Sequence, residues 1–174
     1  MDKHATSFDY FKSDIKRWIY NKFDENSKIL DVGAGCGTYY DLLKDKYKNI
    51  DAVEIYFPNI IDYNLKNKYI NVYNCDIINF KYNYYDLIIF GDIIEHLSLS
   101  DAKDVLNYAF NKCKNLIVAV PYNFPTMIID ENKYENHIQI DLTSYNMKER
   151  YPMLKLLYKN YAYGYYIKNE NYKI

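Results

Sequence analysis

The stretch ILDVGAGCGTYY, residues 29–40, decides the fold of this chain. A short apolar run at residues 29–32 is followed by three glycines that alternate with other residues: Gly33, Gly35 and Gly37. The run has the length of a buried strand, and a helical pattern follows from Tyr39. Glycine permits positive φ and lets a ligand approach the backbone closely. The stretch therefore predicts a strand, a bare turn that contacts a ligand, and a helix.

The same alternation of strands and helices continues along the chain. Further buried strands are expected at residues 50–55, 69–73, 85–90 and 116–120. Residues 39–48 and 101–113 have helical spacing, and Pro58 is placed to open another helix. Residues 153–167 contain two β-rich stretches that predict an antiparallel hairpin at a sheet edge. We therefore predict an α/β fold, a three-layer αβα sandwich with a mostly parallel, seven-stranded sheet.

Size and composition set broad limits on function. The 174 residues suit a single domain, residues 1–174. A net charge of −1 is unlike the basic footprint of nucleic-acid binders, so no such partner is expected. The 23 tyrosines are interpreted as compositional bias. The three cysteines are far apart, which predicts free thiols in a reducing compartment and no metal site.

Two further features bear on location and on the ends of the domain. No apolar run approaches the roughly 20 residues that span a bilayer, and the N-terminus lacks a signal-peptide core. A soluble cytoplasmic protein is expected. Residues 1–24 predict an amphipathic N-terminal helix with Ser7 as its N-cap. Residues 122–147 are irregular and too long for an ordinary connection, which predicts a functional loop.

Four acids follow successive predicted strands: Asp31, Glu54, Asp76 and Asp92. The dinucleotide pattern G-x-G-x-x-G would need a glycine at Thr38, where the third glycine falls one residue early. A pyrophosphate among these acids would be repelled by about 4 kcal/mol for each pair of charges at 4 Å. A ligand with a cationic centre, an amine and a ribose diol is therefore favoured.

Five motifs in order resemble those of the class I S-adenosylmethionine-dependent methyltransferases. ILDVGAGCGT is similar to the first motif of that family, DAVEI to the second and NCDI to the third. YDLIIFGDIIEHL resembles the fourth motif and NLIVAVP the fifth strand. The resemblance covers nearly the whole chain. It implies a methyltransferase that uses S-adenosylmethionine.

The resemblance also implies roles for matching residues around the methionine and ribose parts of that cofactor. Gly33 and Gly35 would line the methionine moiety through their backbone, and Gly37 is a further cofactor-binding residue of the same turn. Asp31 would orient the site around the amino group, directly or through water. Glu54 would accept hydrogen bonds from both ribose hydroxyls.

A second group of matching residues is implied at the adenine. Ile55 would lie against the ring, and Asp76 would accept from the adenine amino group, with the Ile77 amide nearby. Asp92 and Ile93 would close the pocket after the fourth strand. Two alternatives remain open, because Asp76 could instead cap the next segment and Asp92 could be an acid at a helix N-terminus.

Candidate catalytic residues are the histidines His96 and His137. Methyl transfer from a sulfonium depends mainly on alignment, and a base is needed only if the acceptor must lose a proton. His96 could act as that base or could pack beneath the cofactor. His137 could act as base or could fix its loop to the sheet, because histidine titrates near neutral pH.

Acceptor-binding residues are predicted in the segment MIIDENKYENHIQIDLT. Its NKYENH resembles a loop, Asn-x-Tyr-Glu-x-His, of poorly characterised bacterial and phage methyltransferases. Tyr134 and Glu135 are predicted to bind a polar acceptor, and Tyr122 and Tyr10 to line the entrance. The first helix could form a lid or could simply pack against the domain.

The acceptor itself is predicted only as a class. Amino-group methyltransferases that act on nucleic acid or glutamine often carry an Asp- or Asn-Pro-Pro-aromatic box where this chain reads GDII. A small molecule with a hydroxyl, carboxyl or amine is therefore expected. A non-catalytic binding protein or partner subunit, and an NAD-dependent oxidoreductase, remain alternatives. The oligomeric state is not predicted.

Overall fold

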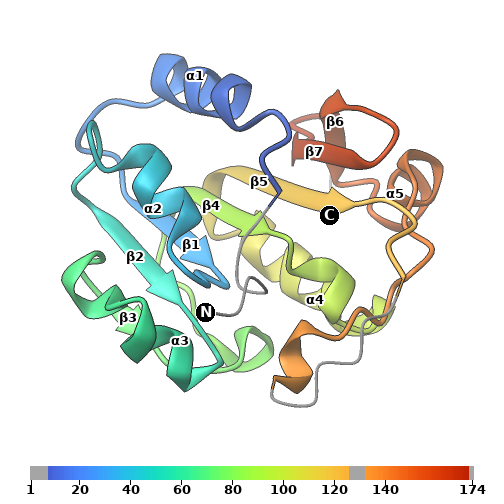
Figure 1. Cartoon of the computed structure of the whole chain (residues 1–174). Coiled ribbons are helices and arrows are strands. Elements are labelled where there is room, and N and C mark those ends of the chain that lie inside the picture. Colours follow the sequence, from blue (N-terminus) through green and yellow to red (C-terminus); the bar gives the residue numbers. More distant parts are fainter. Residues whose placement is uncertain (1–7, 126–131, 173–174) are drawn as a thin grey trace.

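The computed structural model describes residues 8–125 and 132–172. One seven-stranded sheet crosses it in the order β3-β2-β1-β4-β5-β7-β6 (Figure 1). In chain order the strands are β1 Ile29–Val32, β2 Ile50–Val53, β3 Val72–Tyr73, β4 Tyr85–Gly91, β5 Cys113–Pro121, β6 Leu154–Lys159 and β7 Tyr163–Lys168. Strands β1 to β5 pair in parallel, whereas β7 runs antiparallel to β5 and β6. This confirms the predicted mostly parallel sheet with an antiparallel C-terminal hairpin.

Helices cover both faces of the sheet and make the predicted three layers. The α-helices are α1 Lys12–Lys22, α2 Thr38–Leu43, α3 Phe57–Asp62, α4 Leu99–Phe110 and α5 Ser144–Arg150. Residues of α1, α2 and α3 share one apolar cluster with alternate strand residues such as Ile29 and Ile89. Residues of α4 and α5 share the other cluster with strand residues such as Leu30 and Ile88. The two-residue period of the strands divides the core in this way.

Some element boundaries differ from those expected from the sequence. Helix α1 begins only at Lys12, because Phe11 before it has a left-handed conformation with φ 57°. The predicted cap Ser7 lies outside the described residues. Pro121 is the last residue of β5 rather than the residue after it. Helix α5 was not predicted, and Thr143 caps it through a hydrogen bond from the Asn146 amide.

The strand register brings the functional turns to one edge of the sheet. Val32 at the end of β1 lies beside Val53 of β2 and Phe90 of β4. The turns that follow these strands therefore meet at the carboxyl edge. The chain order reverses between β1 and β4, which is where ligands bind in open α/β sheets. No helix within the described ranges is long and apolar enough to cross a membrane.

Candidate active site

The turn after β1 is made of glycines in left-handed conformations. Gly33, Gly35 and Gly37 have φ of 68°, 52° and 89°. A Cβ on Gly33 would lie 1.9 Å from the Ile93 Cδ1 atom, so glycine is required there for space as well as for conformation. The Gly33 amide donates to the Val53 carbonyl at 2.8 Å, which joins the turn to β2.

Glu54, directly after β2, holds this glycine turn in place. One carboxylate oxygen accepts from the Gly35 amide and the other from the Tyr56 amide, both at 2.8 Å. The side chain is only 4% exposed, and burial raises its pKa while these backbone hydrogen bonds oppose the rise. The Asn59 side chain and the Ile55 amide also hydrogen-bond this carboxylate, so Glu54 is the acceptor around which the turn is organised.

Asp31 is a buried acid at the base of the turn. Its side chain is 1% exposed and accepts a hydrogen bond from the Tyr69 hydroxyl at 2.6 Å. Burial raises its pKa to about 6. Lys12, at the start of α1, is also buried, and burial lowers its pKa to about 8 although Asp92 and Asp31 attract its charge. Its ammonium lies 4.1 Å from the centre of the Tyr39 ring.

A cavity of about 310 Å³ opens beside the glycine turn. Five residues that the sequence predicted for cofactor binding line it: Gly33, Ile55, Asp76, Ile77 and Ile93. Asp76 also caps the short helix that follows β3, because its carboxylate accepts from the Ile78 amide at 3.0 Å. Asp76 therefore caps this helix and also lines the cavity.

Asp92 follows β4 in a left-handed conformation with φ 56°. Its carboxylate accepts from the Tyr163 hydroxyl of β7 at 2.6 Å. The rings of Phe8 and Tyr10 lie 5.8 Å and 5.9 Å from that of Tyr163. The residues that reach over the carboxyl edge are thus those that precede α1, while α1 itself packs into the core through Ile15 and Ile19.

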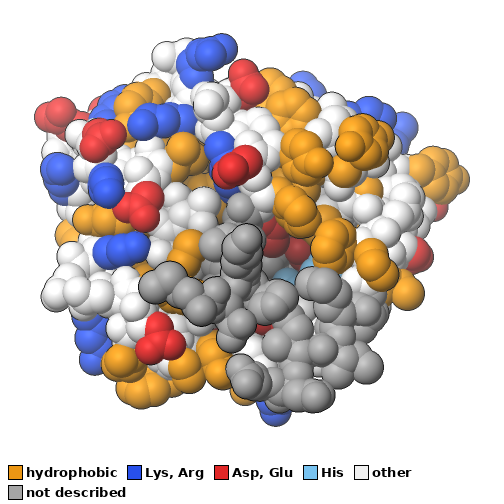
Figure 2. All heavy atoms as spheres, viewed as in Figure 1, with side chains coloured by type: hydrophobic (Ala, Val, Ile, Leu, Met, Phe, Trp, Pro, Cys, Tyr) orange, Lys and Arg blue, Asp and Glu red, His pale blue; other side chains and the backbone are white. Residues whose placement is uncertain are grey.

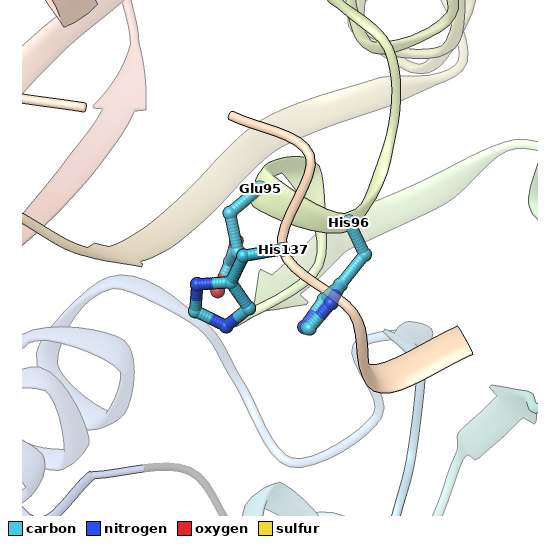
Figure 3. Close-up of side chains that lie close together, drawn as sticks. All are labelled: Glu95, His96 and His137. Carbon is cyan, nitrogen blue, oxygen red and sulfur yellow. The ribbon is translucent and has the colours of Figure 1, made fainter. Parts of the chain in front are cut away.

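The turn after Asp92 brings two histidines and a buried acid together. The rings of His96 and His137 are 4.7 Å apart and meet edge to face. One ligand-capable atom from each of Glu95, His96 and His137 lies within 4.8 Å of the others (Figure 3). Burial lowers the pKa of His96 to about 4 and also lowers the pKa of His137. His96 also lines the cavity.

Gln139 fixes the segment that carries His137 onto this turn. Its side-chain amide donates to the carbonyls of Ile94 at 2.8 Å and Leu97 at 3.2 Å, and its oxygen accepts from the Tyr151 hydroxyl at 2.9 Å. The amides of Ile138 and Gln139 donate to the Glu95 carbonyl. The segment is thus fixed by the residues that follow His137, and the two roles predicted for His137 itself stay predictions.

The predicted acceptor-binding residues fall into two groups. Tyr134 lines the cavity, and burial raises the pKa of Glu135 to about 7 beside Glu54 and Asp92. Tyr122 is instead packed in the core, where its hydroxyl bonds to that of Tyr166, which argues against its predicted place at the entrance. Tyr10 is partly exposed against Tyr163. Residues 126–131 of the predicted loop region lie outside the described residues.

Three residues of the site were not predicted from the sequence: Glu95, Lys12 and Gln139. Glu95 and His96 are adjacent, but His137 comes from a distant segment, so the sequence shows no metal-ligand spacing. Lys12 is marked only by its place on a helix, and no pattern marks Gln139. Figure 2 shows acidic side chains and a histidine recessed in the middle of this face, next to hydrophobic side chains.

Comparisons with known proteins support the fold. No protein-family model and no curated protein sequence matches the chain. Among solved structures, an S-adenosylmethionine-dependent methyltransferase from Clostridium acetobutylicum matches with a TM-score of 0.67 and 15% identity, over 92% of this chain and 91% of that one.

Two further solved structures agree with this match. A SAM-dependent methyltransferase from Archaeoglobus fulgidus matches with a TM-score of 0.65 and 16% identity, over 90% and 91% of the two chains. Magnesium protoporphyrin IX methyltransferase from Synechocystis, crystallised with SAH, matches with a TM-score of 0.65 and 11% identity, over 90% of this chain and 80% of that one. The chain has the fold of the class I S-adenosylmethionine-dependent methyltransferases.

Proposed function

We propose that this protein is a methyltransferase that uses S-adenosylmethionine and acts on a small-molecule acceptor. One observation carries the proposal: three left-handed glycines form a turn that is tied to Glu54 through the Gly35 amide, and the first of them, Gly33, lines a cavity of about 310 Å³. The fold and the S-adenosylhomocysteine bound in the Synechocystis enzyme support the choice of cofactor.

The residues around the glycine turn fit the separate parts of this cofactor. The buried carboxyl of Asp31 suits an amino group, and the carboxylate of Glu54, an acceptor at the end of β2, suits ribose hydroxyls. The apolar walls formed by Ile55, Ile77 and Ile93 suit an adenine ring. Asp76 is placed on the same wall to accept from the adenine amino group.

Methyl transfer from S-adenosylmethionine depends on alignment of the acceptor and needs no nucleophilic side chain of the protein. When bound, the cofactor supplies a methyl group that is already activated by its sulfonium. The protein then has to hold the acceptor in line with that methyl group and exclude water, and orientation of this kind supplies about 7–11 kcal/mol. Tyr134, which lines the cavity together with His96, and its neighbour Glu135 are our candidates for holding the acceptor.

Calorimetry with S-adenosylmethionine and S-adenosylhomocysteine tests the cofactor. We expect both to bind, and NAD⁺ not to bind. The substitution Glu54→Ala should weaken binding by about 1–3 kcal/mol, since a charge-assisted hydrogen bond is lost. Glu54→Gln is the control that keeps one carbonyl acceptor and removes the charge. Unchanged affinity in Glu54→Ala would remove this residue from the site, and binding of NAD⁺ alone would refute the proposal.

Transfer of a tritiated methyl group to components of a cell extract tests catalysis. A labelled small molecule would support an enzyme. Cofactor binding without any labelled product would favour the non-catalytic alternative.

A further inference from the structure

The cluster of Glu95, His96 and His137 has a composition that differs from the rest of the site. Its three side chains offer a carboxylate oxygen and two imidazole nitrogens, and these atoms lie within 4.8 Å of one another. Atoms bound to one Zn²⁺ at about 2.1 Å are separated by about 3–4 Å. Small side-chain rotations would therefore bring all three atoms onto one ion.

The surroundings of Glu95 point to a bound ligand independently of the distances within the cluster. Its side chain is 1% exposed, and neither carboxylate oxygen has a hydrogen-bond partner among the described residues. In Figure 3 this carboxyl group overlaps the His137 ring, and a carboxylate oxygen lies within 4.8 Å of a ring nitrogen. A buried carboxyl without a partner costs free energy, and such groups are normally paired or coordinate a metal.

Both histidines are oriented by the backbone. The His96 Nδ1 atom lies 3.3 Å from the Asn136 carbonyl oxygen, which can only accept, and a proton on Nδ1 would leave the Nε2 lone pair for a metal. The backbone of Phe124 hydrogen-bonds the His137 ring. Metal-binding histidines commonly have one ring nitrogen fixed in this manner.

We infer that Glu95, His96 and His137 bind a divalent first-row transition-metal cation whose open coordination positions receive an oxygen of the methyl acceptor. Imidazole nitrogen favours such cations over Mg²⁺, which prefers oxygen ligands. Three protein ligands leave at least one position open, as in catalytic zinc sites. His96 lines the cavity that adjoins the glycine turn, so one of the three ligands lies beside the proposed cofactor site.

This inference deepens the proposed function and rests on it for its chemical role. A hydroxyl on a divalent cation loses its proton far more readily than in water. The acceptor oxygen would form a bond to the methyl carbon as the carbon–sulfur bond breaks. The electron pair of that bond stays on sulfur, which becomes a neutral thioether, and the hydroxyl proton passes to water. The acceptor class narrows to molecules with a hydroxyl.

Metal binding is tested on the full chain, stripped of metal and freed of any affinity tag. Calorimetry with Zn²⁺ and visible absorption with Co²⁺ should each show one site, with Mg²⁺ binding more weakly. Glu95→Gln and His137→Ala should weaken Zn²⁺ binding at least tenfold. The control Glu149→Gln removes an exposed acid elsewhere and should change nothing.

Calorimetry with S-adenosylhomocysteine on the same variants separates the possible failures. Retained binding shows that a variant is folded. Binding of S-adenosylhomocysteine without any Zn²⁺ or Co²⁺ site, or a site that His137→Ala leaves intact, would overturn the metal inference and spare the proposed function. A metal site without S-adenosylhomocysteine binding would refute the proposed function and keep the site.

Discussion

Two regions at the carboxyl edge of the sheet are built in different ways. The glycine region consists of the turn 33–37 with Asp31 and Glu54, and its shape comes from backbone conformation and backbone hydrogen bonds. The histidine region consists of the turn 92–97 and residues 132–139, two segments far apart in the chain that are joined by the Gln139 side chain and by the Ile138 and Gln139 amides. A turn shaped by glycines is marked in the sequence, whereas a contact between distant segments leaves almost no pattern.

The largest expected effect concerns the buried acid of the glycine region. Burial raises the pKa of Asp31 from 3.8 to about 6, so the folded state keeps a proton that the unfolded chain releases. Stability from this group is therefore present below pH 3.8 and is lost as pH rises to about 6. At about 1.4 kcal/mol per pH unit the loss is about 3 kcal/mol.

The substitution Asp31→Asn measures that loss. Urea unfolding should show a variant of nearly wild-type stability at pH 4 that exceeds the wild type by up to about 3 kcal/mol at pH 7. Its affinity for S-adenosylmethionine at pH 7 should be lower, because the carboxylate that suits the amino group is gone. A stability difference that does not change with pH would contradict the proposed cost of the buried charge.

The second prediction is that a change in the histidine region leaves the glycine region unaffected. Gln139→Met keeps the length of the side chain and removes four hydrogen bonds, the longest of them a 3.5 Å bond from the Arg150 guanidinium. Each of the three shorter bonds has a net value of about 1 kcal/mol. Stability should fall by about 2–3 kcal/mol in urea unfolding. Methyl transfer and Zn²⁺ affinity should also fall, while binding of S-adenosylhomocysteine stays unchanged.

A matched control for this variant is Asn49→Ala, which removes one exposed side-chain hydrogen bond to the Asn26 carbonyl. It should alter stability by less than about 1 kcal/mol. Loss of S-adenosylhomocysteine binding in Gln139→Met would mean that the two regions are not separable.

The contrast also explains which parts of the molecule were predictable from its sequence. Alternating apolar runs predicted the five parallel strands, since burial on both faces leaves continuous apolar stretches. Helix α5 was missed because Thr143 caps a short, polar stretch inside an irregular segment. The cavity residues could be predicted because they come directly after strands. The proximity of Glu95 and His137 could not be predicted, since it depends on contacts between segments far apart in the chain.

The smallest effect tests the glycine region itself. Gly33→Ala and Gly37→Ala each place a Cβ on a left-handed residue, which costs about 1–2 kcal/mol. Only at Gly33 does the new Cβ meet Ile93, which must then turn into the cavity; at Gly37 it meets the flexible end of Lys68. Both variants should lose similar stability in urea, and only Gly33→Ala should lose affinity for S-adenosylhomocysteine, by at least tenfold. Equal losses of affinity would show that conformation alone, rather than the closeness of Ile93, makes glycine necessary at position 33.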